Sequence, residues 1–257
     1  MKTIEEVLKT VPSTKAEDWH QHSNGKGWVY SSASVADSAY VGPDARVSDN
    51  ARVSGNAWVS GDARVSGKAQ VFGDAWVYGD AWVSGEAVVF GNARLSDKAQ
   101  VSGNAQVYGN VWVCGNAQVF GDAWVYGDTW VSGEAVVFGD AQVSGKAHVF
   151  GDAQVSGNVW VCGNAQVFGK ARVYGNAQVY GYAQVNGDDW ETTPLFLQGT
   201  KHSATNCKHG WLAIGCQVRT FADWQANVET IAEENGYTKE EAAEYRAIVD
   251  FMIKVGK

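Results

Sequence analysis

The chain has 257 residues, including 30 glycines, 12 tryptophans and only three prolines, and its net charge is −8. This mild acidity argues against binding along nucleic acid, which requires a basic stripe. No stretch approaches the ~18 consecutive apolar residues of a membrane span. We therefore expect no contact with a membrane and regard nucleic acid as an improbable partner.

The first segment, residues 1–28, predicts a cap at the N-terminal end of the fold. It begins MKTIEEVLKTVPS, with glutamates where a signal peptide would need an apolar run. Four apolar residues at helical spacing predict a short helix over 4–11: Ile4, Val7, Leu8 and Val11. A frayed terminal helix is the alternative. The four cysteines match no disulfide framework, so we expect reduced thiols and a cytoplasmic protein of a bacterial or phage-infected cell.

Residues 29–190 consist of a six-residue repeat, A-x-V-x-G-[DN], as in ARVSGN at 51–56. From Val29 to Val185 an aliphatic residue recurs at every sixth position, which gives 27 units. A period of six fits a short strand and a tight turn. Side chains alternate along a strand, so Ala and Val face the interior and the x residues face outward. The glycine and the Asp or Asn after it form a corner. Copies must stack at about 4.8 Å, because each strand alone has two open edges.

The repeat resembles the hexapeptide repeat of left-handed β-helices, in which three hexads close a triangular coil. The resemblance implies a mainly-β fold, a left-handed parallel β-helix of about nine triangular coils over residues 29–190. The sequence GDAWVYGDAWVSGEAVVFG at 73–91 returns at 121–139 with a single change. The step of 48 residues is eight hexads, which is not a multiple of three, so Trp76 and Trp124 should lie on different faces.

Residues 191–257 lack the hexad and predict a small α+β domain with a hairpin and two helices. Short strands are expected at 194–199, 202–207 and 211–218. Capping pairs predict helices over about 221–235 and 239–255: Thr220 with Asp223, and Thr238 with Glu241. The order of coil and tail, with IGC at 214–216 and ENGYTKEE at 234–241, resembles a group of bacterial and prophage hexapeptide-repeat proteins.

The outward residues supply the main functional signal. Taking the residue before the core valine in every third hexad gives one row: Tyr40, Trp58, Trp76, Arg94, Trp112, Trp130 and His148. Rings about 4.8 Å apart can stack, with Arg94 as a cation–π rung. Such a strip exceeds what monomers usually expose, and we interpret it as a partner-binding face. The alternative is a ladder that only stabilises the sheet.

The other outward rows differ from this one. A second face carries Phe72, Phe90, Tyr108 and Tyr126, and the third is plainer, with Arg46, Arg64, Gln100, Gln118 and serines. Among chemical sites, His148 is the only histidine of the coil and would be the base if the protein were an acyltransferase, as many hexapeptide-repeat proteins are. No metal site is expected: His202, Cys207, His209 and Cys216 are interpreted as residues of a hairpin core, and a zinc site is the alternative. No cofactor is expected.

The combined prediction is a non-enzymatic structural or interaction protein of phage or prophage origin. Its aromatic face would serve self-association, with a trimer favoured, or would bind an unknown protein. The alternatives are a hexapeptide-repeat acyltransferase, a phage counter-defence inhibitor and a nucleic-acid mimic.

Overall fold

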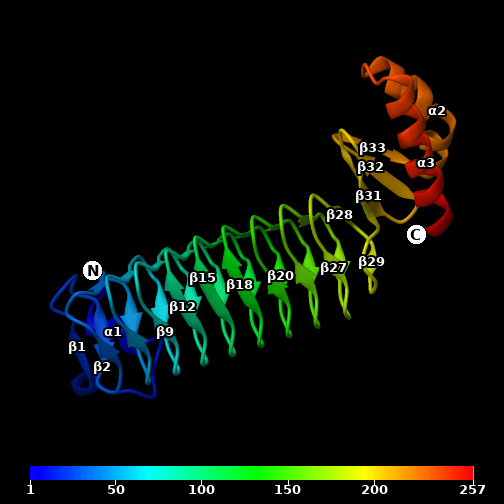
Figure 1. Ribbon diagram of the computed structural model, residues 1–257. Helices are drawn as coiled ribbons and strands as arrows, with labels where there is room; N and C mark the ends of the chain where they lie inside the picture. Colours follow the sequence, from blue (N-terminus) through cyan, green and yellow to red (C-terminus); the bar gives the residue numbers. More distant parts are fainter. Residues whose placement is uncertain (257) are drawn as a thin grey trace.

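A computed structural model describes residues 1–256 and shows a mainly-β rod with helices at both ends (Figure 1). The rod is a parallel β-solenoid with one strand at each of the 27 hexads, from β2 to β28. Successive strands join three different sheets in turn, so strands three apart in sequence are direct neighbours. The predicted parallel solenoid of about nine coils is confirmed. Its left-handed sense remains what the resemblance implies.

The three sheets are called A, B and C. Sheet A has 11 strands: β1 (Trp19–Gln21), β2 (Trp28–Tyr30), β5 (Arg46–Val47), β8 (Arg64–Val65), β11 (Trp82–Val83), β14 (Gln100–Val101), β17 (Gln118–Val119), β20 (Val136–Val137), β23 (Gln154–Val155), β26 (Arg172–Val173) and β29 (Asp189–Trp190). Sheet B has nine strands: β3 (Ser34–Val35), β6 (Arg52–Val53), β9 (Gln70–Val71), β12 (Val88–Gly91), β15 (Gln106–Gly109), β18 (Trp124–Gly127), β21 (Gln142–Val143), β24 (Trp160–Val161) and β27 (Gln178–Val179). Sheet C also has nine: β4 (Tyr40–Val41), β7 (Trp58–Val59), β10 (Trp76–Val77), β13 (Arg94–Leu95), β16 (Trp112–Val113), β19 (Trp130–Val131), β22 (His148–Val149), β25 (Gln166–Phe168) and β28 (Gln184–Asn186).

The solenoid core consists almost entirely of alanine and valine. The aliphatic residue of each hexad is buried, except for the half-buried Val35 of the first coil. Residues 18 apart pair directly, as Trp58 does with Trp76 and Val59 with Val77. Trp76 lies in sheet C and Trp124 in sheet B, so the 48-residue step changes the face as predicted. The duplication keeps the core pattern and rearranges the surface.

The N-terminal segment covers the first coils (Figure 1). Helix α1 (Ile4–Leu8) is shorter than the predicted 4–11 and begins with a capping box between Thr3 and Glu6. After it come a 3₁₀ turn (Ala16–Asp18) and then β1, which pairs antiparallel with β2. This strand was not predicted, because three residues carry too little periodicity to indicate one. It closes the open edge of sheet A, which would otherwise expose unpaired backbone groups.

At the other end, Trp190 terminates the core. It pairs with Val173 at a separation of 17 residues instead of 18, is 2% exposed, and lies edge-on against His209 at 5.1 Å between ring centroids. Beyond it lies a fourth, antiparallel sheet with strands β30 (Phe196–Gln198), β31 (Ser203–Lys208), β32 (Trp211–Ile214) and β33 (Gln217–Thr220). The prediction of one strand over 211–218 is wrong, because a turn at Gly215 (φ +57°) divides it.

The chain ends with two helices, α2 (Phe221–Glu234) and α3 (Lys239–Val255), within a residue of the predicted bounds. Thr220 and Thr238 cap them through the backbone N–H groups of Asp223 and Glu241, as predicted. Their apolar faces pack on the fourth sheet and form a second core, separate from the solenoid core. No helix within residues 1–256 combines the length and the apolar character needed to cross a membrane.

Candidate binding face

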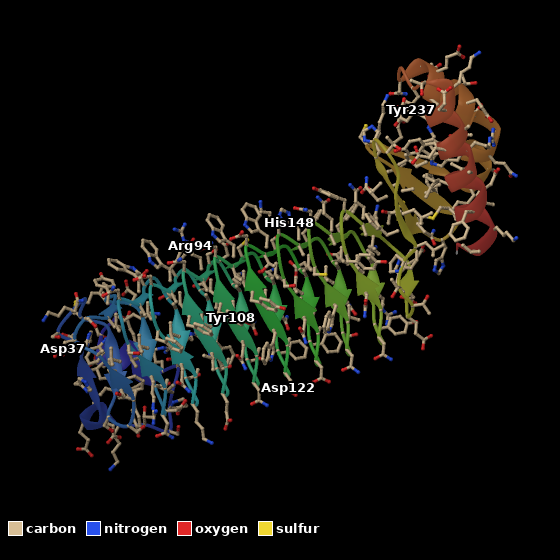
Figure 2. All side chains as sticks on the ribbon, viewed as in Figure 1. Asp37, Arg94, Tyr108, Asp122, His148 and Tyr237 are labelled. Carbon is tan, nitrogen blue, oxygen red and sulfur yellow. The ribbon has the colours of Figure 1, made fainter. Side chains whose placement is uncertain are left out.

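Sheet C carries the row of outward side chains singled out in the sequence. Parallel pairing of β4, β7, β10, β13, β16, β19 and β22 places each member beside the next. Figure 2 labels two of them, Arg94 and His148, along the same edge of the rod. We call the row the sheet C ladder: Tyr40, Trp58, Trp76, Arg94, Trp112, Trp130 and His148.

Contacts within the ladder are continuous. The ring centroids of Trp58 and Trp76 are 5.7 Å apart, and those of Trp112 and Trp130 are 5.2 Å apart. Between these pairs the Arg94 guanidinium lies 5.6 Å from the Trp76 ring and 5.3 Å from the Trp112 ring. The ends are Tyr40, 3.7 Å from Trp58, and His148, 5.6 Å from Trp130. The sequence-derived row is therefore one connected stack.

The orientation of the rings determines what a partner would meet. Stacked neighbours are inclined by 11° to 23°, so ring faces are directed at each other along the rod. The outer edges of the indoles are left for solvent, and the four tryptophans remain 37% to 45% exposed. Indole edges carry the positive end of the ring quadrupole and the N–H donor. The ladder thus offers a long apolar ridge with donors rather than flat platforms.

Aromatic residues elsewhere on the rod are arranged differently. The row Phe72, Phe90, Tyr108 and Tyr126 also stacks, at 4.8 to 5.2 Å, but its members are half-buried. Trp124 and Trp160 on sheet B are 42% and 51% exposed, yet each lies between two glutamines. In contrast to both groups, the side chains of the sheet C ladder are stacked along the rod and its tryptophans are also exposed.

His148, the base of the alternative enzyme reading, is the last aromatic rung. Its ring is half-buried and stacks on Trp130, and within residues 1–256 its side chain makes no hydrogen bond or ion pair. None of the five hollows described for that part of the chain is lined by His148.

The four candidate zinc ligands are not gathered into one site. Cys207 is 4% exposed in β31, and burial raises its pKa to about 11, which disfavours the thiolate that zinc needs. His209 contacts Trp190 at the end of the coil, whereas His202 and Cys216 line a separate cavity. Across residues 1–256 there is no group of three or more His, Cys, Asp or Glu that could hold a metal ion.

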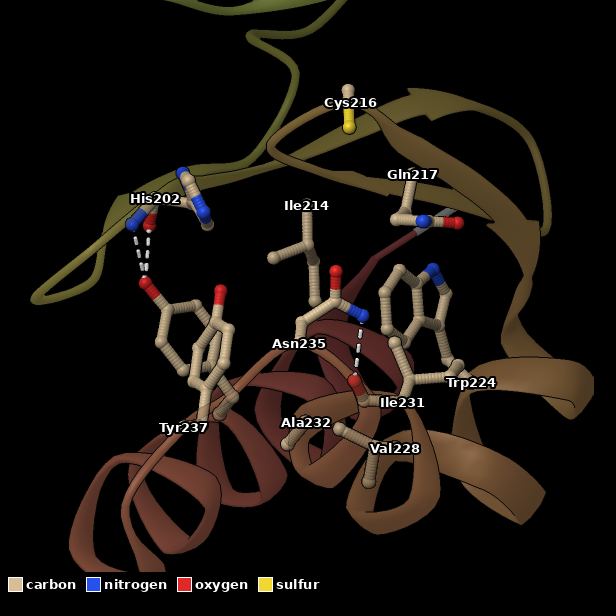
Figure 3. A pocket seen from close by; sticks show the side chains of 11 residues that line it. His202, Ile214, Cys216, Gln217, Trp224, Val228, Ile231, Ala232, Asn235 and Tyr237 are labelled. Atoms are coloured by element: carbon tan, nitrogen blue, oxygen red, sulfur yellow. Dashed lines mark hydrogen bonds between the residues drawn. The ribbon is translucent and has the colours of Figure 1, made fainter.

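The cavity shared by His202 and Cys216 lies between the fourth sheet and the two helices (Figure 3). Its volume is about 50 Å³, which is small for an organic ligand. The Tyr245 hydroxyl donates to the His202 carbonyl at 2.8 Å and accepts from the Lys201 N–H at 3.0 Å. These bonds hold the loop before β31 on α3. The cavity is thus part of the packing of this region.

Sequence reasoning missed a larger hollow on sheet A. The repeat predicts a plain outward face for Arg46, but residues 10–14 cross above it and leave it 5% exposed. The hollow measures about 300 Å³. No periodic signal marks the covering segment, because residues 10–14 belong to no repeat.

Comparison with known proteins supports the repeat assignment. Five segments match a family model described as the YdcK β-solenoid repeat: residues 45–61, 69–85, 99–115, 117–133 and 165–181. The hexads are β-solenoid repeats. This confirms the predicted kind of repeat, while kinship with prophage proteins in particular stays an expectation.

The similarity of the chain to solved structures is weaker than its similarity to this repeat family. UDP-N-acetylglucosamine O-acyltransferase from Moraxella catarrhalis is 12% identical over 89% of this chain and 83% of its own, with a TM-score of 0.33. LpxA from Acinetobacter baumannii is 12% identical over 88% and 86%, with a TM-score of 0.31. A search of curated proteins finds no match.

Proposed function

We propose that the protein is a non-enzymatic interaction protein that self-associates through the sheet C ladder. The observation that carries the proposal is the continuous ladder, in which four stacked tryptophans remain 37% to 45% exposed. Desolvating indoles is a common source of binding energy at interfaces, where tryptophan is enriched at hot spots. A strip of this length would bury apolar surface that a monomer leaves in water.

The distribution of charge on the rod favours a second copy of the chain at the ladder, because the ladder is a face without acidic side chains. The protein has a net charge of −8, so two copies repel each other at most approaches. None of the nine outward positions before the core residues of sheet C is acidic, from Tyr40 to Gln184. The carboxylates lie at the corners, as Asp62 and Asp80 do. Three rods with their ladders turned toward a common axis would bring no carboxylate of this row face to face with another, and a trimer is the expected assembly.

The other readings have less support. A foreign protein partner would use the same ridge, and a ladder that only stabilises the sheet would leave the chain monomeric. For the acyltransferase alternative, the surroundings of His148 supply no supporting observation. A counter-defence role and nucleic-acid mimicry share the rod shape but no specific contact. Phage or prophage origin and a cytoplasmic location stay expectations from the resemblance and from the unpaired cysteines.

The test replaces two rungs, Trp76→Ser with Trp112→Ser, and measures mass by light scattering after size exclusion. Each loss should weaken association at least tenfold, as expected for hot-spot tryptophans. The matched control is Trp124→Ser with Trp160→Ser, which removes two indoles of comparable exposure outside the ladder. We expect an oligomer for the native chain and the control, and a monomer for the ladder variant. A monomeric native chain, or equal masses for all three, would refute self-association through this face.

A further inference from the structure

The hollow above sheet A has the features of a built binding site. It lies between the N-terminal segment and the strands β2, β5, β8 and β11. Its lining includes Arg46, Arg64, Ser48, Ser66, Tyr30 and Trp82. The volume of about 300 Å³ is at the lower end of the range for small-molecule sites. Cationic, hydroxyl and aromatic groups therefore converge on one space.

Arg46 is the residue that most requires explanation. It is 5% exposed, and its buried Nη1 has no hydrogen-bond partner anywhere in residues 1–256. A buried guanidinium without an acceptor is costly, so such groups are normally paired. Burial lowers the pKa of Arg46, the neighbouring charge of Arg64 lowers it further, and Asp62 opposes both.

The nearby carboxylates already have other partners. Asp62 pairs with Lys2, and Asp49, which also lines the hollow, accepts the Gly67 N–H at 2.9 Å. Arg64 is the direct strand neighbour of Arg46 and adds a second positive charge. Within residues 1–256 neither Arg46 nor Arg64 forms a salt bridge, and two arginines with one aspartate give the lining a net charge of +1, which favours an oxyanion.

The hydroxyl and aromatic groups refine the match. The Trp82 indole donates its N–H to Ser66 Oγ at 3.0 Å, so the proton of the Ser66 hydroxyl remains free for an acceptor. Ser48 lines the same space. Hydroxyl donors beside two arginines suit the several oxygens of a phosphate better than the two of a carboxylate. The exposed Trp82 offers a surface for an apolar or aromatic body next to the charged group.

We propose that this hollow is a binding site for a small phosphate monoester. The phosphate lies between Arg46 and Arg64, with the Ser66 hydroxyl as a further donor. The organic part of the ligand lies against Trp82. This site is independent of the sheet C ladder and of the oligomeric state.

Calorimetric titration of the full chain with phenyl phosphate and with inorganic phosphate tests the proposal. Arg46→Gln and Arg64→Gln should each weaken binding of both at least tenfold. Trp82→Ser should weaken binding of phenyl phosphate several-fold more than binding of inorganic phosphate, because it removes the apolar surface as well as the N–H that orients the Ser66 hydroxyl. Arg52→Gln is the matched control, since Arg52 occupies the same repeat position on sheet B and does not line the hollow.

Thermal unfolding without ligand separates binding from folding. Arg46→Gln should unfold at or above the native temperature, because it removes an unpaired buried charge. Should that variant fail to fold, the exposed Arg64 carries the test. The proposal is overturned if the native chain binds neither phosphate probe, or if Arg52→Gln loses as much affinity as Arg64→Gln. Tighter binding of benzoate than of phenyl phosphate would overturn the assignment to phosphate.

Discussion

The solenoid and the C-terminal α+β region are built on opposite principles. The solenoid buries many copies of two small side chains, alanine and valine, and each coil contacts only its neighbours. The C-terminal region instead buries a few large and different side chains, among them Trp224, Tyr245 and Met252. Repetition distributes stability over many equivalent positions. Irregular packing concentrates it in single residues that nothing else in the chain can replace.

The two regions also form hydrogen bonds differently. In the solenoid, backbone bonds between coils recur with little variation, as from the Trp76 N–H to the Ala93 carbonyl at 2.8 Å. In the C-terminal region, side chains make the long-range bonds, as when the Trp224 indole donates to the Leu212 carbonyl at 2.7 Å. A local defect should therefore remain local in the rod, but it should loosen the whole of the C-terminal region.

The largest effect is expected from Trp224→Ala. This change removes a side chain that is 2% exposed and should cost about 3–5 kcal/mol, the usual range for a buried tryptophan. Hydrogen exchange should show lost protection over β30–β33, α2 and α3, with the solenoid strands unchanged. Trp160→Ala, at a position 51% exposed, is the control and should cost less than about 1 kcal/mol. Equal loss of protection along the rod would contradict the division into two cores.

A corner glycine gives the next largest effect. Gly109 has φ +90°, and a Cβ there would lie 2.8 Å from the carbonyl oxygen of Gly127 in the next coil. Gly109→Ala combines left-handed strain with this contact and should cost about 2–3 kcal/mol. Gly210→Ala is the matched control, since Gly210 has φ +75° but no atom within 4 Å of the added Cβ. Denaturant unfolding should show the smaller loss for Gly210→Ala. The reverse order would mean that coil spacing is not what excludes larger residues.

The same contrast separates the features that the sequence could predict from those that it could not. A hexad repeated 27 times specifies its strands and the sheet C ladder. Each coil places its outward residue directly beside the equivalent residue of the next coil, as with Trp58 and Trp76. Features that occur once were missed. The covering of Arg46 and the shortened step to Trp190 depend on contacts between segments that share no pattern. The turn at Gly215 was missed although glycine is a local turn signal, because the apolar residues on both sides of it suggested one continuous strand. Helices α2 and α3 were exceptions, because their caps are local signals.

The smallest effect concerns the single difference between the two copies of the duplicated sequence. Thr129 occupies an alanine position of the core, is fully buried, and its hydroxyl has no hydrogen-bond partner within residues 1–256. An unpaired buried hydroxyl costs about 1–3 kcal/mol, and part of this cost is offset by the packing of the methyl group. Thr129→Val keeps the shape, and Val111, one coil below, shows that valine fits this row.

Thr129→Val should therefore raise the free energy of unfolding by about 1 kcal/mol, measured by denaturant titration. The reciprocal change, Ala81→Thr, places the same hydroxyl in the other copy and should lower stability by a similar amount. If both changes leave the free energy of unfolding unchanged, the alanine position of the core accommodates a polar group, and it does so equally well in both copies. If Thr129→Val is destabilising, the two copies are not interchangeable, and the rod contains a position as individual as those of the C-terminal region.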